Sequence, residues 1–338
     1  MESTKKLRLA YLVGSVLLLA VFFLSLIAGN RDVSTADLLS ALMKGPGLPD
    51  DKALRLAAVI LGKVRVPRAL AGLLCGIGLS VSGLLLQVSL NNSLLAPGII
   101  GINSGAGAFV LICGLIFPGM PLFRSMFSFL GAFLAAMVVV AIAARAGMSK
   151  TTLILAGVAV SYLFTAISDI IITFRPDSVS DKVGFSLGGL SGVSSVSLRF
   201  SFPLFALGIV LVLVLGPGID LFLLGDETAQ GLGLPVKRWR FLCILASTLL
   251  AASAVSLCGL LSFVGMIIPN FVRMVSGNHF RKQATLCALY GPAFLLLCDL
   301  MARQLFYPYE LPAGLILSLI GVPFFITVLV RRKKRLSL

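Results

Sequence analysis

Long apolar stretches, repeated along almost the whole chain, are the sequence feature that most limits what this protein can fold into. A helix needs about 20 apolar residues to cross the hydrocarbon core of a bilayer. Hydrophobic residues make up 58% of the 338 residues and charged residues 12%, whereas soluble domains carry about 25% charge. We therefore predict a single-domain, all-α polytopic membrane protein over residues 1–338, with about ten transmembrane helices. The stretches lie at residues 9–28, 66–90, 99–117, 122–144, 151–174, 200–215, 241–260, 261–275, 283–305 and 311–330.

The basic residues predict how these helices are oriented. Ten spans place both termini on one side, and the tail at 331–335 is the densest cluster of positive charge. Because Lys and Arg favour cytosolic loops, we expect both termini in the cytosol, and we attribute the net charge of +15 to these loops rather than to nucleic-acid binding. The first stretch lacks an A-x-A cleavage site, so we interpret it as a span and not as a signal peptide.

Two segments between the long stretches have a different character. Residues 29–63 are polar, with an expected short interfacial helix at 33–39, and residues 183–193 are too short and glycine-rich to span. The latter suit a half-helix that lines a cavity. Glycines also recur with Ala and Ser at helical spacing, as at Gly72 and Gly76, and such small faces let helices pack closely in lipid.

A polar hairpin at residues 220–240 separates two of the most apolar stretches. Asp226 and Glu227 open a short helical pattern at 228–232, which suits the helix dipole, and Gly233 ends it. A protein that only held its own helices together would not need a structured polar hairpin here. We therefore expect this hairpin to dock another protein in the cytosol.

The sequence offers no enzyme active site. The six cysteines lie in apolar stretches without a C-x-x-C pair, and a single histidine excludes a multi-histidine metal centre. Ser191, in GGLSG, resembles the nucleophile of intramembrane rhomboid proteases, but its partner would have to be His279, which is expected on the opposite side of the membrane. No G-x-x-x-x-G-K-[ST] loop is present, so the chain is not expected to bind ATP by that route.

Two acidic residues, Asp169 and Asp299, lie inside apolar stretches, where a carboxylate is a functional candidate by default. An ion-coupled secondary transporter could use both. The alternative is structural, because Asp299 lies one helical turn before Arg303 and can pair with it on one helix face.

Arg65, Arg68 and Arg303 lie at predicted outer helix ends, against the positive-inside trend. They are candidates for docking an acidic partner or steering an anionic substrate. Solvated helix ends are the alternative that spacing leaves open.

A series of motifs follows in one order across nearly the whole chain. They are RVPRAL (65–70), G-x-x-L-S-x-S-G-x-x-x-Q (76–87), NSLLAP (92–97), GINSGA (101–106), LAGVAVS (155–161), LGDETAQGLGLP (224–235), FVGMIIPNFVR (263–273), DLMAR (299–303), ELPAG (310–314) and GVPFF (321–325). This series resembles the FecCD-type permeases, the membrane subunits of type II ABC importers for iron-siderophores, haem and vitamin B12. The chain departs from the family pattern at Ser93, Leu95 and Asn270, where Pro, Ala and His are usual, and in the loop 277–281, which reads GNHFR where G-x-D-H-R is usual.

The resemblance implies a type II ABC importer permease fold that works as a homodimer in the bacterial cytoplasmic (inner) membrane. Two ATPase subunits would sit below it, and a periplasmic or lipoprotein substrate-binding protein above it. ATP and Mg would be bound by the ATPase, and this chain would need no cofactor or metal of its own.

The resemblance also implies roles for individual residues. Arg65, Arg68 and Arg303 would meet acidic residues of the binding protein, while 151–174, 183–193 and 311–330 would face the central path. The residues expected to couple to the ATPase are Leu224, Gly225, Asp226, Glu227, Ala229, Leu232, Gly233 and Pro235. The expected cytosolic gate consists of Ser149, Lys150, Thr151 and Thr152.

The predicted function is therefore translocation, without covalent chemistry in this chain. An iron chelate (siderophore or haem) or cobalamin would be moved by alternating access, driven by ATP hydrolysis in the partner. The alternative from another class is the ion-coupled transporter that uses Asp169 and Asp299.

Overall fold

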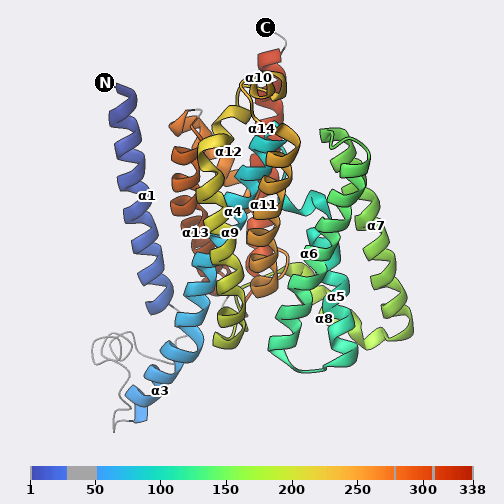
Figure 1. The fold of residues 1–338 in the computed structure, drawn as a ribbon. Helices are drawn as coiled ribbons and strands as arrows, with labels where there is room; N and C mark the ends of the chain where they lie inside the picture. The colour runs from blue at the N-terminus through green and yellow to red at the C-terminus, as the bar shows by residue number, and fades with distance from the viewer. Residues whose placement is uncertain (1, 29–51, 278, 307–308, 337–338) are drawn as a thin grey trace.

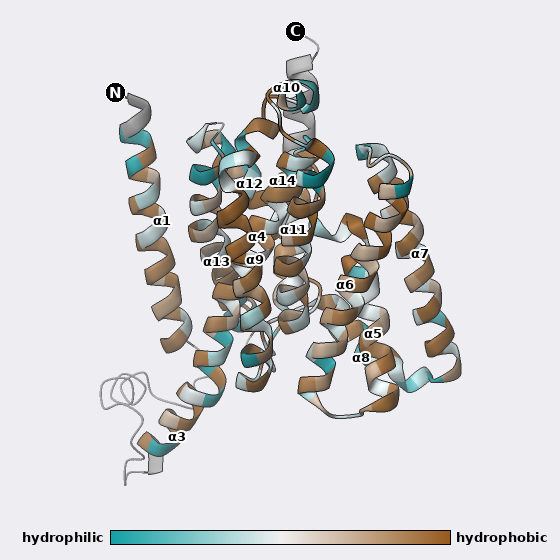
Figure 2. Cartoon of the chain, in the orientation of Figure 1, coloured by the Kyte–Doolittle hydropathy of each residue, from teal (hydrophilic) through white to brown (hydrophobic). Residues whose placement is uncertain are grey.

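The computed structural model describes residues 2–28, 52–277, 279–306 and 309–336. Over these residues the chain is helical, without strands, and Figure 1 shows the long helices side by side with both termini at one end. Figure 2 shows apolar residues along most of the helix lengths, with hydrophilic residues gathered toward the two ends. In the described part, seven helices are long and apolar enough to span a membrane, and three apolar helices are shorter. The predicted all-α polytopic architecture is confirmed.

The long helices follow the predicted stretches closely. They are α1 (Glu2–Ile27), α4 (Val66–Ser89), α5 (Ile102–Ile116), α6 (Pro121–Arg145), α7 (Lys150–Phe174), α9 (Ser195–Phe222), α11 (Val236–Cys258), α12 (Val264–Ser276), α13 (Phe280–Gln304) and α14 (Ala313–Leu336). The shorter ones are α3 (Lys52–Ile60), α8 (Val179–Leu187) and α10 (Asp226–Gly231). Figure 1 shows α10 at the end of the molecule that holds both termini, which we call the inner end, and α3 at the opposite, outer end.

Local sequence signals explain where several helices begin. The hydroxyl of Ser149 accepts a hydrogen bond from the Thr152 amide and caps α7, and Ser194 caps α9 in the same way through the Ser197 amide. Such caps satisfy one of the four amides that a helix start leaves without a backbone partner. α6 begins with Pro121, a residue that suits the first helical turn because its missing N–H would be unpaired there anyway.

Small residues allow α4 to lie at the centre of the bundle. At Gly83 the helix meets the backbone of Gly265 in α12 so closely that a Cβ atom would overlap the Gly265 carbonyl. Hydroxyls add links between helices: Ser80 Oγ donates to the Cys287 carbonyl at 2.9 Å, and Ser82 Oγ lies 2.7 Å from Ser247 Oγ. The predicted packing of helices through small faces is confirmed.

The structure corrects two predictions about the weaker segments. Residues 52–60 were expected to be part of a polar connection, but they form α3, which continues through a π-helical turn at Leu61–Arg65 into α4. The half-helix expected at 183–193 is α8, which begins earlier, at Val179, and gives way to a glycine-rich turn after Leu187. The interfacial helix predicted at 33–39 lies outside the described residues.

Candidate functional site

The outer end holds a group of charges, the outer charge cluster, formed by the buried Arg65, Arg68, Asp299 and Arg303 and by the exposed Glu310. Asp299 is 0% exposed and lies between two guanidinium groups: Arg68 Nη2 is 2.9 Å from its Oδ1, and Arg303 Nη2 is 3.1 Å from its Oδ2. Arg68 Nη1 also pairs with Glu310 Oε2 at 3.0 Å. The predicted pairing of Asp299 with Arg303 one turn away is confirmed, and Arg68 joins that pair from another helix.

The same cluster holds the end of α1. Arg65 Nη1 donates to the carbonyls of Leu26 and Ile27, at 2.8 Å and 2.6 Å. Arg303 Nη2 donates to Ser25 Oγ at 2.8 Å. Carbonyls at a helix C-terminus carry partial negative charge and lack backbone donors, so cations are favourable there.

This arrangement bears on the predicted docking role of Arg65, Arg68 and Arg303. The structure brings the three together, but each is buried and its guanidinium donates to partners within the chain. A direct bond to an acidic partner protein would require the cluster to open. Docking by these arginines therefore stays a prediction.

The second intramembrane acid, Asp169, has a different environment. It lies near the outer end of α7, is largely exposed, and accepts a hydrogen bond from Lys182 Nζ of the neighbouring α8 segment at 2.7 Å. Both carboxylates thus have basic partners inside the chain.

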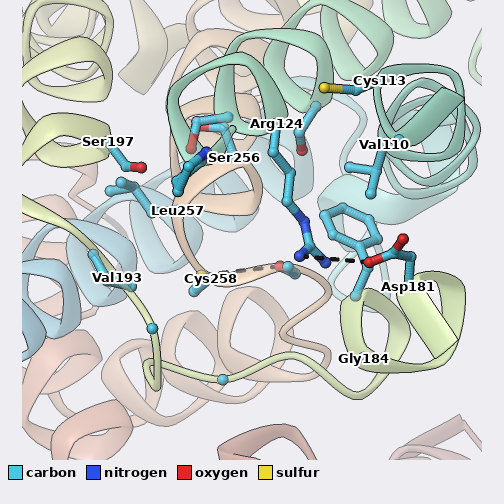
Figure 3. A pocket seen from close by; sticks show the side chains of 18 of the residues that line it. Val110, Cys113, Arg124, Asp181, Gly184, Val193, Ser197, Ser256, Leu257 and Cys258 are labelled. Atoms are coloured by element: carbon cyan, nitrogen blue, oxygen red, sulfur yellow. Dashed lines mark hydrogen bonds and ion pairs between the residues drawn. The ribbon is translucent and has the colours of Figure 1, made fainter. Parts of the chain in front are cut away.

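An outer cavity of about 550 Å³ opens between α5, α6, α8, the 188–193 turn and the end of α11. Figure 3 shows Arg124 and Asp181 pointing toward one another across it, and their closest charged atoms are 3.8 Å apart. Ser128, which is 1% exposed and lines the cavity, has an Oγ atom without a hydrogen-bond partner. The cavity is therefore polar enough to hold water or an oxygen-rich solute.

Ser191 lines this cavity, whereas His279 immediately precedes α13 at the other end of the molecule. The direction of α13 follows from its contacts: Lys282 accepts from Tyr11 in the first half of α1, and Arg303 reaches the end of α1. A serine–histidine pair cannot form, as predicted.

The polar hairpin forms α10, which begins two residues before the predicted pattern. Leu224 and Leu232, on either side of it, expose large apolar side chains, while Ala229 is fully buried. Gly225 and Gly233 take positive φ angles of 93° and 86°, which favour glycine and allow the sharp turns around so short a helix. The result is a short helix with one buried side chain, Ala229, and two exposed apolar side chains, Leu224 and Leu232, beside it.

Arg240, one turn into α11, connects this hairpin to the rest of the inner end. It is 4% exposed, and its Nη2 donates to Asp226 Oδ2, at the start of α10, at 2.7 Å. Its Nη1 donates to the carbonyl of Met148 at 3.0 Å and its Nε to the carbonyl of Ser89 at 3.2 Å. The predicted gate begins directly after Met148, at Ser149. The structure thus brings the predicted coupling and gate residues together.

A smaller inner crevice lies beside this contact, with a volume of about 380 Å³. One wall is the loop after α4, at residues 90–95, and the other is the start of α7, at Lys150, Thr151 and Ile154. Lys150 Nζ also lies 3.4 Å from Asp226 Oδ2, so that one carboxylate oxygen faces both Lys150 and Arg240.

A second polar group at the inner end escaped sequence reasoning. Asn270 Nδ2 donates to the Ser93 carbonyl at 2.8 Å, and Arg273 Nη2 donates to Gln87 Oε1 at 3.1 Å. Gln87 Nε2 in turn donates to the Leu95 carbonyl at 3.2 Å. Three of the positions that depart from the family pattern, Ser93, Leu95 and Asn270, therefore share one contact region. The sequence signal for this region was the pair of polar residues Asn270 and Arg273, one turn apart in the apolar helix α12.

Comparisons with known proteins give a consistent answer. Residues 17–331 match the FecCD transport family. The Fe(3+)-citrate import system permease protein YfmD of Bacillus subtilis is 32% identical, over 96% of each chain. The iron(3+)-hydroxamate import system permease protein FhuB of Bacillus subtilis is 36% identical, over 82% of this chain and 72% of its own. The Fe(3+) dicitrate transport system permease protein FecD of Escherichia coli is 31% identical, over 81% of this chain and 86% of its own.

Solved structures with the same arrangement of helices include a metal-chelate type ABC transporter in an inward-facing conformation. Its TM-score is 0.81 and its sequence 26% identical, with 96% of this chain and 99% of that one covered. A fold likeness alone extends to PsaBC from Streptococcus pneumoniae, with a TM-score of 0.58 at 16% identity, over 87% of this chain and 95% of that one.

Proposed function

Since this chain belongs to the FecCD transport family, and is a multi-pass permease component of an ABC importer with the type II fold rather than an enzyme, we propose that its substrate is an Fe(3+) chelate. The relatives named for Fe(3+)-citrate and Fe(3+)-hydroxamate import support an oxygen-coordinated chelate over haem or cobalamin.

The pairing of both intramembrane acids is the observation that favours an ATP-driven importer over an ion-coupled carrier. A carboxylate that relays protons or sodium has to exchange its ion with water. Asp299 is enclosed by Arg68 and Arg303 and is fully buried. Asp169 is 62% exposed and is paired with Lys182 near the outer end of α7. The energy for transport would then come from outside this chain, through α10.

The ABC importer family implies two kinds of partner, an ATPase and a substrate-binding protein. We place the ATPase on α10, where Leu224 and Leu232 are exposed and Glu227 lies in the first turn. ATP and Mg would be held by that subunit. The substrate-binding protein would dock at the outer end, near the outer cavity, and deliver the chelate there.

We further propose that two copies of the chain form the path between them. α7 exposes apolar side chains along its whole length, including Leu155, Tyr162 and Phe174, and α14 exposes Leu319 and Ile326. In a homodimer these faces would surround a central passage, and ATP-driven movement of α10 would open it to alternate sides.

The proposal is tested by uptake of radiolabelled ferric citrate or a ferric hydroxamate into proteoliposomes that contain this chain, its ATPase and its binding protein. Glu227→Ala and Gly231→Pro alter α10 directly. We expect both variants to lower uptake per ATP hydrolysed by about 5- to 150-fold, the range of typical coupling energies.

Two results would overturn the proposal. One is uptake by this chain alone under a proton or sodium gradient, which would return attention to Asp169 and Asp299. The other is unchanged uptake per ATP in both α10 variants, with the ATPase still bound.

A further inference from the structure

We propose that Arg240 is the positioning residue that transmits movement of α10 to the start of α7, and so sets the width of the inner crevice. The inference rests on the proposed function, because it assumes that a partner displaces α10.

Arg240 is the point at which four segments of the inner end meet. Its guanidinium donates to Asp226 in α10, to the Met148 carbonyl before α7 and to the Ser89 carbonyl at the end of α4. Its Cζ atom lies 6.0 Å from the centre of the Phe222 ring at the end of α9, within the range of a cation–π contact. A single planar group with donors in fixed directions thus sets the relative positions of these segments.

The burial of Arg240 explains why movement of Asp226 would be transmitted. At 4% exposure, the guanidinium has little access to water that could replace a lost partner. A buried charge that loses its counter-charge is strongly destabilised. If α10 moves, Arg240 therefore follows Asp226, or the pair breaks at high cost. Lys150, the first residue of α7, approaches the same carboxylate oxygen at 3.4 Å, but both side chains are 37% exposed, so Arg240 is the main link.

The turn before α7, at Gly147 and Met148 (here the joint), has a backbone geometry that can change when Arg240 moves. Gly147 and Met148 have consecutive positive φ angles of 91° and 60°. The left-handed conformation is unfavourable for methionine and persists only where the surroundings impose it. The Arg240 bond to the Met148 carbonyl is one such constraint, so its loss would let the joint relax and α7 reorient.

The backbone atoms that Arg240 holds adjoin the two walls of the inner crevice. Ser89 directly precedes the wall at 90–95, and Met148 precedes the wall that begins at Lys150. Moving the guanidinium relative to either carbonyl therefore changes the spacing of the walls. A positioning role is also consistent with the burial of Arg240, since its neighbours Lys237 and Arg238 are exposed.

The experiment compares Arg240→Gln, Arg240→Lys and Asp226→Asn in the assembled importer. Arg145→Gln, an exposed arginine at the inner end of α6, is the matched control. Co-purification of the ATPase reports assembly, and ATP hydrolysis and ferric-chelate uptake are measured on the same proteoliposomes. We expect Arg240→Gln to keep the ATPase bound and active while uptake per ATP falls by at least about fivefold, the lower end of typical coupling.

The conservative variant separates positioning from simple stabilisation. Arg240→Lys keeps the charge and can hold Asp226, but a single ammonium cannot reproduce the guanidinium's fixed directions toward both carbonyls. We expect it to keep the ATPase bound, as Arg240→Gln does, and to recover uptake per ATP only in part. Asp226→Asn should resemble Arg240→Gln, and Arg145→Gln should match the unaltered protein.

A second measurement follows the movement itself. The six native cysteines are buried, so spin labels at Thr151→Cys in α7 and Gln230→Cys in α10 can be attached selectively. With Arg240 present, the label distance distribution should stay narrow when ATP is bound, because α10 and α7 move together. Arg240→Gln should broaden or shift it.

The outcomes distinguish failure of the proposed function from failure of the role proposed for Arg240. If the unaltered complex shows no ATP-driven uptake, the proposed function fails. If it does, but Arg240→Gln lowers uptake and hydrolysis in parallel, or leaves the label distances unchanged, then Arg240 is a structural contact only and the inference is overturned.

Discussion

At the scale of single residues, Asp299 is a buried charge whose stability depends on its arginine partners. It is fully buried and pairs with two guanidinium groups, those of Arg68 and Arg303. Removing one member of a buried charge group leaves the others uncompensated, at a cost of about 3–5 kcal/mol. We expect Asp299→Asn to lower the midpoint of thermal unfolding in detergent markedly, measured by size-exclusion chromatography after heating.

Asp169→Asn is the matched control, since it removes the other intramembrane carboxylate. Its partner Lys182 and Asp169 itself are both substantially exposed, and exposed ion pairs contribute about 0–1 kcal/mol. The unfolding midpoint and ferric-chelate uptake should both stay close to those of the unaltered protein. A larger loss of uptake in Asp169→Asn than in Asp299→Asn, at equal stability, would revive the ion-coupled alternative.

The sequence revealed only part of this cluster. The spacing of Asp299 and Arg303 on one helix was sufficient to predict their pairing. Arg68 is 231 residues away from Asp299 in the chain, and spacing carries no information about such a contact. For that reason, the sequence pattern placed the three arginines at exposed helix ends, whereas in the structure they are buried together.

At the scale of helices, α4 and α12 pack backbone against backbone at Gly83 and Gly265. A Cβ atom on Gly83 would overlap the Gly265 carbonyl, a backbone atom that cannot move without displacing α12. We expect Gly83→Ala to destabilise the protein by about 1–3 kcal/mol, as overpacking usually does. The measurement is again the unfolding midpoint in detergent.

Gly62→Ala provides the comparison, because nothing lies within 4 Å of a Cβ atom built at Gly62. This variant should unfold at the same temperature as the unaltered chain or slightly above it. Equal losses in both variants would show that close packing at Gly83 is not the cause.

Helix positions were the most predictable part of the structure. Each predicted apolar stretch corresponds to one helix, because a chain in lipid has to satisfy its backbone hydrogen bonds internally. The ends agree less well, and α1 and α9 extend several residues beyond the predicted stretches. Prediction failed where an apolar run is short or is interrupted by a charged residue. α3 carries Arg55 among its apolar residues and reads as a polar connection, although it continues directly into α4. α8 is too short to be recognised by hydropathy.

At the scale of the whole molecule, the exposed apolar face of α7 either contacts a second copy of the chain or contacts lipid only, and cross-linking distinguishes the two. Tyr162, 73% exposed in the single chain, lies near the middle of this face. We expect Tyr162→Cys to be cross-linked to its copy by a short bifunctional thiol reagent in membranes, giving a band of twice the mass on a denaturing gel.

Leu12→Cys, on the exposed face of α1, is the control for random collision in the bilayer, with 62% exposure. It should remain monomeric under the same conditions. If both positions cross-link equally, or neither does, the α7 face is not the contact between copies.

The inner end shows what a sequence can and cannot reveal about a site. The sequence pattern predicted a coupling hairpin, and the family resemblance implied a gate at 149–152 as a separate feature; the structure brings these residues to either side of one side chain. Arg240 carries no motif of its own and looks like any other base that closes a cytosolic loop. Its importance lies in three backbone or side-chain partners, at residues 89, 148 and 226, that only the folded chain brings within reach.

The contact between Arg68 and Asp299 also has a consequence for biosynthesis. Their separation of 231 residues means that, at translation rates of about 5–20 residues per second, Arg68 waits roughly 10–50 s before its counter-charge leaves the ribosome. During this interval α4 carries an arginine without that counter-charge, which costs about 2.5–3.5 kcal/mol at the centre of a span and less near its end. The arginine lies in the first turn of α4, where its long side chain can reach the headgroups until α13 arrives. Final assembly of the outer end is therefore a late event, completed only when most of the protein has been made.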